Sequence, residues 1–134
     1  MDLNWISRFQ PQLLAILRII AALLFLEHGL MKLFHFPAPQ IPGPLPPILV
    51  AAAIIELVTG FLILIGLFTR LAAFIASGEM AVAYFTNHFP KSFWPGINKG
   101  EAAILFCFIF LYIASAGAGA WSIDSARLKS APIR

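Results

Sequence analysis

Charged residues are scarce in this sequence, and their scarcity restricts the class of protein. Asp, Glu, Lys and Arg make up 11% of the 134 residues, whereas hydrophobic residues make up 60%. The mean hydropathy is +0.89, and soluble domains carry roughly a quarter charged residues. The composition therefore predicts an integral membrane protein. The formal net charge of +3 comes from basic residues scattered at the edges of apolar runs, so we expect no nucleic-acid partner.

Cysteine and metal-binding patterns are also lacking. Cys107 is the only cysteine, so the chain contains no internal disulfide and no CxxC pair. Its position in the apolar run ILFCFIFLYI indicates an inert core residue. The three histidines show neither HxxxH nor HxxE spacing, and we expect no metal site.

Long apolar runs are what the sequence does contain. They predict an all-α membrane protein folded as an antiparallel four-helix transmembrane bundle. A span needs about 20 residues, so four spans use nearly the whole chain, and we expect residues 1–134 to form one transmembrane domain without a soluble catalytic part. The spans are expected at about 12–36, 48–68, 71–88 and 101–116.

The connections between these spans support the antiparallel order. The stretch 35–47 contains six prolines and cannot be helical, so it should run extended across the surface. Thr69 and Arg70 leave only a tight turn between the second and third spans, which should therefore lie side by side.

The basic residues of the short loops predict the orientation, because they are enriched on the cytoplasmic side. One side has five of them, and the other has two with a third at its edge. The first group is Arg8, Arg70, Arg127, Lys129 and Arg134, and the second is Lys91 and Lys99, with Lys32 at the edge. We therefore expect both termini in the cytoplasm and the proline-rich loop on the outer side.

Four of the six acidic residues are glutamates that fall one to a span, at Glu27, Glu56, Glu79 and Glu101. A charge in hydrocarbon is costly unless it has a partner, so these side chains should point into the bundle. Depth along the helices predicts that Arg18 pairs with Glu56 or Glu79. We interpret Arg18, Glu56 and Glu79 as a buried charge network with a structural role, because an ion pair can simply set helix register.

A second group of polar residues lies at the outer ends of the spans, where we expect any functional site. His28 beside Glu27 is an imidazole and carboxylate pair that can carry protons at membrane depth. Lys32 and Glu101 belong to the same group, although anchoring at the membrane interface is an equal alternative. His88 and Asn98 border the outer loops, and for His88 a merely solvated histidine is the alternative.

The order and spacing of several short motifs resemble a known family. Arg18 is followed by LLFLEHGLMKLF, Glu56 and Gly60 precede LILIGLFTR, and NKGEAAILFCFIFLYIASAGAGAWSID comes last. This pattern, over roughly residues 14–124, resembles the DoxX family of small bacterial four-span membrane proteins. The family's positions correspond to Arg18, His28, Gly29, Lys32, Glu56, Gly60, Gly66, Arg70, Asn98, Gly100, Glu101 and Asp124.

The resemblance implies a multi-pass protein of the bacterial inner membrane. The family takes its name from a membrane subunit of a thiosulfate:quinone oxidoreductase, which implies a quinone-interacting or accessory subunit of a membrane-associated oxidoreductase system. The sequence shows no redox centre of its own, so a lipid-soluble quinone or a partner protein's cofactor would have to supply the electrons. We expect no covalently bound cofactor, and whether the chain is itself an enzyme stays open.

In that role, we expect Lys32 or His28 to hydrogen-bond a quinone oxygen, with His88 and Asn98 as further cofactor-binding residues. Glu27 or Glu101 would take or deliver the accompanying proton, so the catalytic candidates are Glu27, His28, Lys32 and Glu101.

Two other functions stay open at this point. The first is a channel or transporter for protons or a small anion, with Arg18, Glu56 and Glu79 along the route, although the spans lack the broken helices of many transporters. The second is a purely structural membrane partner whose charges hold the bundle together. The expected partners are the lipid bilayer and a redox protein, and a homo-oligomer is a further alternative.

Overall fold

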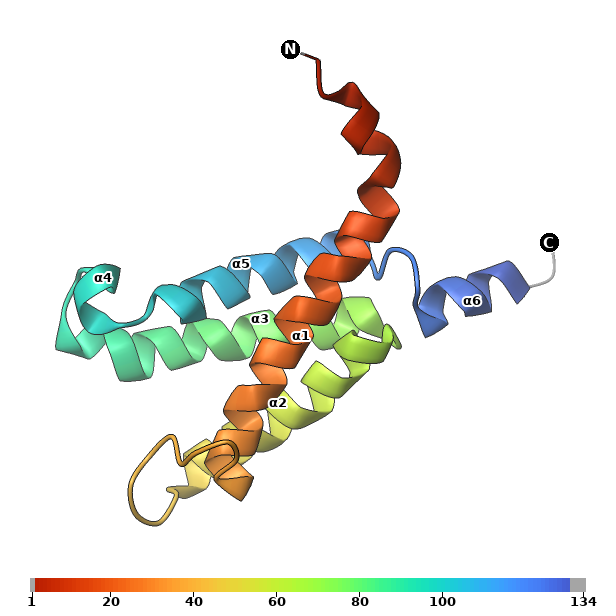
Figure 1. The fold of residues 1–134 in the computed structure, drawn as a ribbon. Helices are drawn as coiled ribbons and strands as arrows, with labels where there is room; N and C mark the ends of the chain where they lie inside the picture. Colours follow the sequence, from red (N-terminus) through yellow and green to blue (C-terminus); the bar gives the residue numbers. More distant parts are fainter. Residues whose placement is uncertain (1, 131–134) are drawn as a thin grey trace.

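The computed structural model describes residues 2–130, in which all regular structure is helical (Figure 1). The prediction of an all-α protein is therefore confirmed for this part of the chain. The α-helices within it are α1 (Gln10–Phe34), α2 (Pro47–Ile65), α3 (Thr69–Ala83), α4 (Pro95–Asn98), α5 (Glu101–Ala116) and α6 (Ile123–Ser130). Arg134, which we assigned to the cytoplasmic side, lies outside the described residues.

Short helical segments flank two of these helices. A 3₁₀ helix, η1 (Asn4–Phe9), leads into α1, and a π-helical turn, η2 (Tyr84–His88), followed by the 3₁₀ turn η3 (Phe89–Lys91), prolongs α3. The third expected span therefore ends in a π turn and not in a regular α-helix. Such turns are rare and are often found at functional sites.

Proline and glycine set the ends of the first two helices. Pro11 lies in the first turn of α1, and Pro47 begins α2, where a missing backbone N–H costs nothing. Gly66 ends α2 at a φ of 69°, a left-handed conformation that favours glycine. The second span consequently stops at Ile65, three residues before the predicted end.

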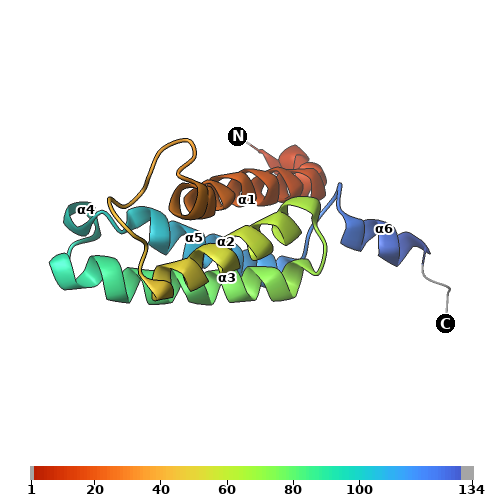
Figure 2. The ribbon, with the colours of Figure 1, turned by 90° about the horizontal axis from the view of Figure 1, so that it is seen from below.

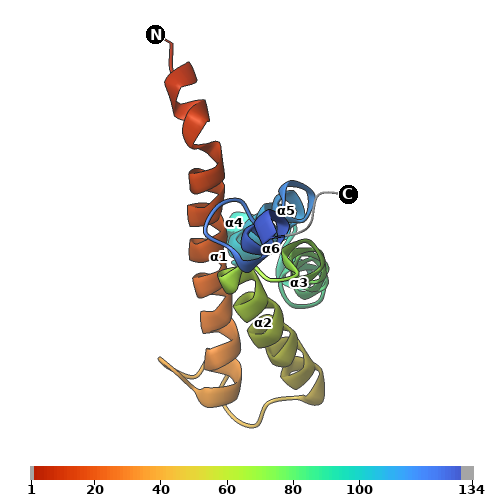
Figure 3. The ribbon, with the colours of Figure 1, turned by 90° about the vertical axis from the view of Figure 1, so that its right-hand side faces the viewer.

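The long helices form two antiparallel pairs that cross steeply. Helices α1 and α2 make one pair, and α3 and α5 make the other (Figure 1). In a view along the axes of α3 and α5, helices α1 and α2 lie across those axes (Figure 3). The helices are thus less closely aligned than we expected for a bundle. Where the pairs meet, α2 packs against both α1 and α3.

Small residues at the crossing allow this arrangement. Buried alanines of α1 and α3, among them Ala22, Ala72 and Ala76, belong to one core cluster with Phe25 and Phe110. The two rings meet edge to face, with their centroids 4.9 Å apart. Small side chains let helix backbones approach closely, and the phenylalanines fill the remaining space.

All four long helices expose large apolar side chains. Exposed side chains include Leu24 on α1, Phe61 on α2, Phe74 on α3 and Phe108 on α5. Among residues 2–130, two helical segments are long and apolar enough to cross a membrane, Asn4–Phe34 and Pro47–Ile65, and α5 is a shorter apolar helix. Large exposed apolar side chains on all four long helices fit contact with lipid.

One end of the molecule is held together by Arg18. Its guanidinium donates hydrogen bonds to five backbone carbonyls, those of Ile63, Leu64, Ala118, Ala120 and Trp121, at 2.9–3.2 Å. The expected pairing of Arg18 with Glu56 or Glu79 is therefore wrong. In the antiparallel pair, Arg18 lies opposite the last turn of α2, whose carbonyls lack partners within the helix and accept its donors.

Two further polar side chains hold the same end. Asp124 accepts hydrogen bonds from the backbone N–H groups of Phe68 (3.0 Å) and Thr69 (2.9 Å) at the start of α3. Arg70 donates to the carbonyls of Ala114 and Ser115 at the end of α5. Helix α6 is thus tied to the start of α3, and the start of α3 is tied to the end of α5.

Candidate functional site

The opposite end of the molecule contains a cavity. The two helix pairs diverge toward the ends that carry the 35–46 loop and α4 (Figures 1 and 2). Between them lies a cavity of about 960 Å³, lined by residues of α1, the 35–46 loop, α2, α3, η2 and α5. Volumes of this order are typical of small-molecule sites. The steep crossing thus creates a space that four aligned helices would fill with side chains.

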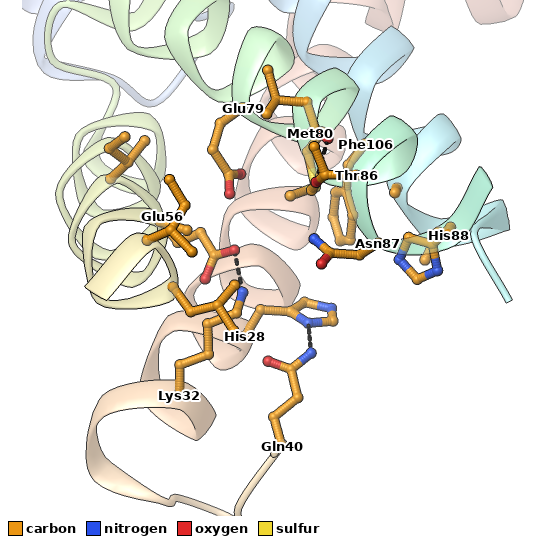
Figure 4. A pocket seen from close by; sticks show the side chains of 18 of the residues that line it. His28, Lys32, Gln40, Glu56, Glu79, Met80, Thr86, Asn87, His88 and Phe106 are labelled. Atoms are coloured by element: carbon orange, nitrogen blue, oxygen red, sulfur yellow. Dashed lines mark hydrogen bonds and ion pairs between the residues drawn. The ribbon is translucent and has the colours of Figure 1, made fainter. Parts of the chain in front are cut away.

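Lys32 and Glu56 form an ion pair in the wall of this cavity. The Nζ atom of Lys32 lies 2.5 Å from Oε1 of Glu56, and the two side chains are only 10% and 0% exposed (Figure 4). Lys32 comes from the last turns of α1 and Glu56 from the middle of α2. Burial of this pair is tolerated because each charge compensates the other.

Glu79 adds a second carboxylate from the opposite pair of helices. It points from α3 toward Glu56 (Figure 4). The Oε2 atoms of Glu56 and Glu79 are both buried. The interior of the cavity therefore has two carboxylates and one ammonium group, and the exposed Lys91 and Lys99 also line it.

His28 lies one turn before Lys32 on α1 and is oriented by two neighbours. The amide nitrogen of Gln40 is 3.2 Å from its Nδ1, and the edge of Phe106 meets its ring with the centroids 5.9 Å apart. The amide nitrogen of Gln40 can only donate, so Nδ1 accepts and the proton of the neutral ring lies on Nε2. His28 therefore has an N–H donor that Gln40 does not use.

The π turn supplies the remaining polar wall. Asn87 and His88 of η2 both line the cavity. The Nδ1 of His88 donates to the carbonyl of Asn98 at 3.1 Å, and the ring stacks on Tyr84. The wider π turn therefore places two successive polar residues at the cavity. The hydrogen bond to Asn98 holds one of them, His88.

The cavity brings together part of the predicted set. Among the candidates it collects His28, Lys32, His88, Glu56 and Glu79. The last two, which we assigned to a structural network with Arg18, thus lie beside the candidate binding residues. Arg18 is at the other end of the molecule and has no contact with them.

Three predicted site residues lie outside the cavity. Glu27 is exposed on another face of α1, because neighbouring helical residues point about 100° apart. Glu101 is exposed in the first turn of α5. Asn98 is buried, but its side chain holds the loop through Tyr84, Ser92 and Gly100 at 2.7–3.2 Å.

Some cavity residues were not predicted. Gln40 belongs to the proline-rich stretch, and no helical spacing could indicate that it folds back onto His28. Phe106 is one of several phenylalanines in an apolar run. Only the packing of α5 against α1 shows that its ring meets His28.

Comparison with known proteins agrees with the family resemblance of the sequence motifs. A family model described as DoxX matches residues 13–89. A protein of Haemophilus influenzae described as "Uncharacterized protein" is 42% identical over 129 residues, which cover 92% of this chain and 96% of that protein. None of the solved structures matches the chain.

Proposed function

Given that this chain belongs to the DoxX family, we propose that it is a four-span protein of the bacterial inner membrane whose cavity binds a quinone. In this proposal it serves as an accessory subunit of a membrane-associated oxidoreductase system. Family membership and the apolar helices already indicate an integral membrane protein. The cavity of about 960 Å³ with its buried Lys32–Glu56 pair is the observation that carries the proposed binding function.

The crossing of the helix pairs is compatible with four spans. Transmembrane helices tilt by up to about 40° from the bilayer normal, so opposite tilts of the two pairs would produce a steep crossing. The 35–46 loop and α4 then face one side of the membrane, and α6 faces the other (Figure 2). Arg8, Arg70, Arg127 and Lys129 lie toward the second side, which favours cytoplasmic termini.

Labelling of single cysteines tests this topology. In a Cys107→Ala background, we expect a membrane-impermeant maleimide added to intact spheroplasts to label Ser92→Cys but not Ser130→Cys. Both positions should react after lysis, which serves as the internal control. Labelling of Ser130→Cys in intact spheroplasts would contradict the proposed orientation.

The residues of the cavity fit a quinone. Its walls include Ile55, Ile75, Met80 and Phe106, which suit an apolar ring and tail. Quinone oxygens accept hydrogen bonds, and Lys32 and His28 have donors on the same side of the cavity. A bound quinone would supply the two-electron chemistry that these side chains lack.

The chain's own residues have separate tasks in this proposal. Lys32 and the Nε2–H of His28 hold and orient a carbonyl oxygen. Glu79 can accept a proton or a hydrogen bond within the cavity. The transporter alternative is less well supported, because all the N–H donors of Arg18 are bonded to backbone carbonyls at the far end.

Calorimetric titration with a short-tailed benzoquinone tests the binding function. We expect saturable binding to the purified protein, and an affinity at least about tenfold lower in Lys32→Met/Glu56→Gln, which corresponds to the loss of about one charged hydrogen bond. The double variant removes both charges and so leaves no unpaired ion. Lys129→Met on α6 is the matched control. Absence of saturable binding, or binding that the double variant leaves unchanged, would overturn the proposal.

A further inference from the structure

The cavity reaches the surface of the protein along a gap between α2 and α3. These two helices meet at the turn that joins them and diverge toward their other ends (Figure 1). Two stripes of cavity residues face this gap, Ile48 and Ala51 on α2 and Ile75, Gly78 and Val82 on α3. Their spacing of three or four residues places each stripe on one face of its helix. All five residues are exposed although they line the cavity, so the cavity is open on this side.

The rim of the α2–α3 gap differs in polarity from the rest of the cavity mouth. None of its five residues has a polar side chain, whereas the exposed Asn87, Lys91 and Lys99 line the end that carries η2 and α4. In the proposed four-span arrangement, the polar end lies at the membrane surface and the gap faces the acyl chains of the bilayer. The gap therefore suits a molecule that is dissolved in the lipid.

Gly78 keeps the gap open at the middle of its α3 edge, one turn from both Ile75 and Val82. A Cβ atom at this position would meet nothing within 4 Å, so close packing does not explain the glycine. Glycine also destabilises the interior of a helix relative to alanine. The next residue, Glu79, points into the cavity (Figure 4). The open position thus borders the interior of the proposed binding site.

We propose that the α2–α3 gap holds the apolar tail of a long-chain quinone, of the isoprenoid type, whose head group lies at Lys32 and His28. This inference rests on the proposed quinone-binding function and names the ligand class and its path, which is sideways from the bilayer. A cavity of about 960 Å³ has the size that encloses a drug-sized molecule. A tail of several isoprene units must therefore leave the cavity, and Gly78 determines whether it can.

Binding of two quinones that differ only in their tails tests this path. One carries a methyl group and the other a decyl chain, and both are titrated calorimetrically in micelles of one detergent. We expect Gly78→Trp to lower the affinity for the decyl quinone relative to the methyl quinone by about tenfold, the size of a typical overpacking effect, because the indole fills the gap. Ala51→Trp, on the α2 edge, should lower the same ratio.

Val58→Trp is the matched control for these variants. Val58 is exposed on the same face of α2 as Ala51, about two turns further along the helix, and lies outside the cavity. Its replacement should leave the ratio of the two affinities unchanged. Partitioning into the micelle cancels, because each variant is compared with the wild type for the same ligand. Far-UV circular dichroism verifies folding, and Ala51→Trp tests the gap from its other edge should Gly78→Trp not fold.

The outcomes separate this inference from the proposed function. If neither quinone binds saturably to the wild type, the quinone site fails and the inference fails with it. If both bind and a folded tryptophan variant of the gap keeps the wild-type ratio, the path is refuted and the quinone site stands. Equal losses for the two ligands, or a loss in Val58→Trp as large as that in Gly78→Trp, would also overturn the inference.

Discussion

The ammonium group of Lys32 on α1 lies 2.5 Å from Oε1 of Glu56 on α2, and the carboxylate is fully buried. This ion pair joins the two helices beside the cavity, whereas Arg18 joins α1 to the end of α2 at the opposite end. The α1–α2 pair is thus fastened at both ends by basic side chains of α1. Of these two basic side chains, only Lys32 binds an acidic residue, whereas Arg18 binds backbone carbonyls.

Replacement of Lys32 alone should lower the free energy of unfolding. In Lys32→Met, the carboxylate of Glu56 stays buried without its counter-charge, and breaking a buried ion pair in this way typically costs about 3–5 kcal/mol. We expect a corresponding fall in the free energy of unfolding, measured by denaturant titration in mixed micelles. Lys32→Met/Glu56→Gln should recover most of the loss, because no uncompensated charge remains. A single variant as stable as the wild type would contradict this account.

Arg18 should not tolerate replacement by lysine. An ammonium group keeps the charge but cannot reach five carbonyls that fan out around a planar guanidinium. Loss of even two such bonds predicts a decrease of about 3 kcal/mol in the free energy of unfolding. Arg8→Lys, at an exposed position in η1, is the matched control and should change stability by less than about 0.5 kcal/mol. Equal behaviour of the two variants would refute the role of Arg18 as a clamp.

Asp124 should make stability depend on pH in the acidic range. Burial alone raises the pKa of its carboxyl group, but the backbone N–H groups of Thr69 and Phe68 and the charge of Arg127 outweigh burial and hold the pKa below its ordinary value. A lowered pKa in the folded state means that the ionised form stabilises the fold above the unfolded pKa of about 3.9. This contribution disappears as the pH falls through the folded pKa.

The measurement is the thermal midpoint between about pH 6 and about pH 3. Asp124→Asn should be less stable than the wild type at the upper end of this range and should approach it at the lower end. Asp2→Asn, which changes the only other aspartate of the chain, should follow the wild type throughout. A constant difference between Asp124→Asn and the wild type would show that the carboxylate charge is unimportant.

Two glycines should respond in opposite ways to alanine. A Cβ atom at Gly29 of α1 would lie 2.8 Å from Cγ of Leu57 and 3.2 Å from the carbonyl oxygen of Ala53 on α2, whereas one at Gly78 of α3 would meet nothing within 4 Å. Gly29→Ala should therefore force the α1–α2 pair apart and cost about 1–3 kcal/mol. Gly78→Ala should leave the free energy of unfolding unchanged or raise it by up to about 1 kcal/mol. A stabilising Gly29→Ala would contradict the close approach.

Some residues show why the sequence predicted part of the site. His28 and Lys32 lie one turn apart on one face of α1, so helical spacing alone places them together. The prediction of His88 as a site residue rests on its position at the outer end of the third span. Glu27 and Glu101 were included because of their depth in the membrane, but depth does not determine which way a side chain points. The fold of residues 117–121 back over α1 decided three of the five partners of Arg18, and no local pattern shows such a fold.

The sequence by itself determined that the protein is helical and suited to a membrane, because composition and apolar run length depend only on local residues. It also determined the family, through the order and spacing of short motifs. Only the tertiary structure decided that the helices form two steeply crossing pairs, that Lys32 rather than Arg18 pairs with Glu56, and that a cavity opens between the pairs. These features depend on crossing angles and on contacts between residues far apart in the chain, which follow from side-chain packing in three dimensions.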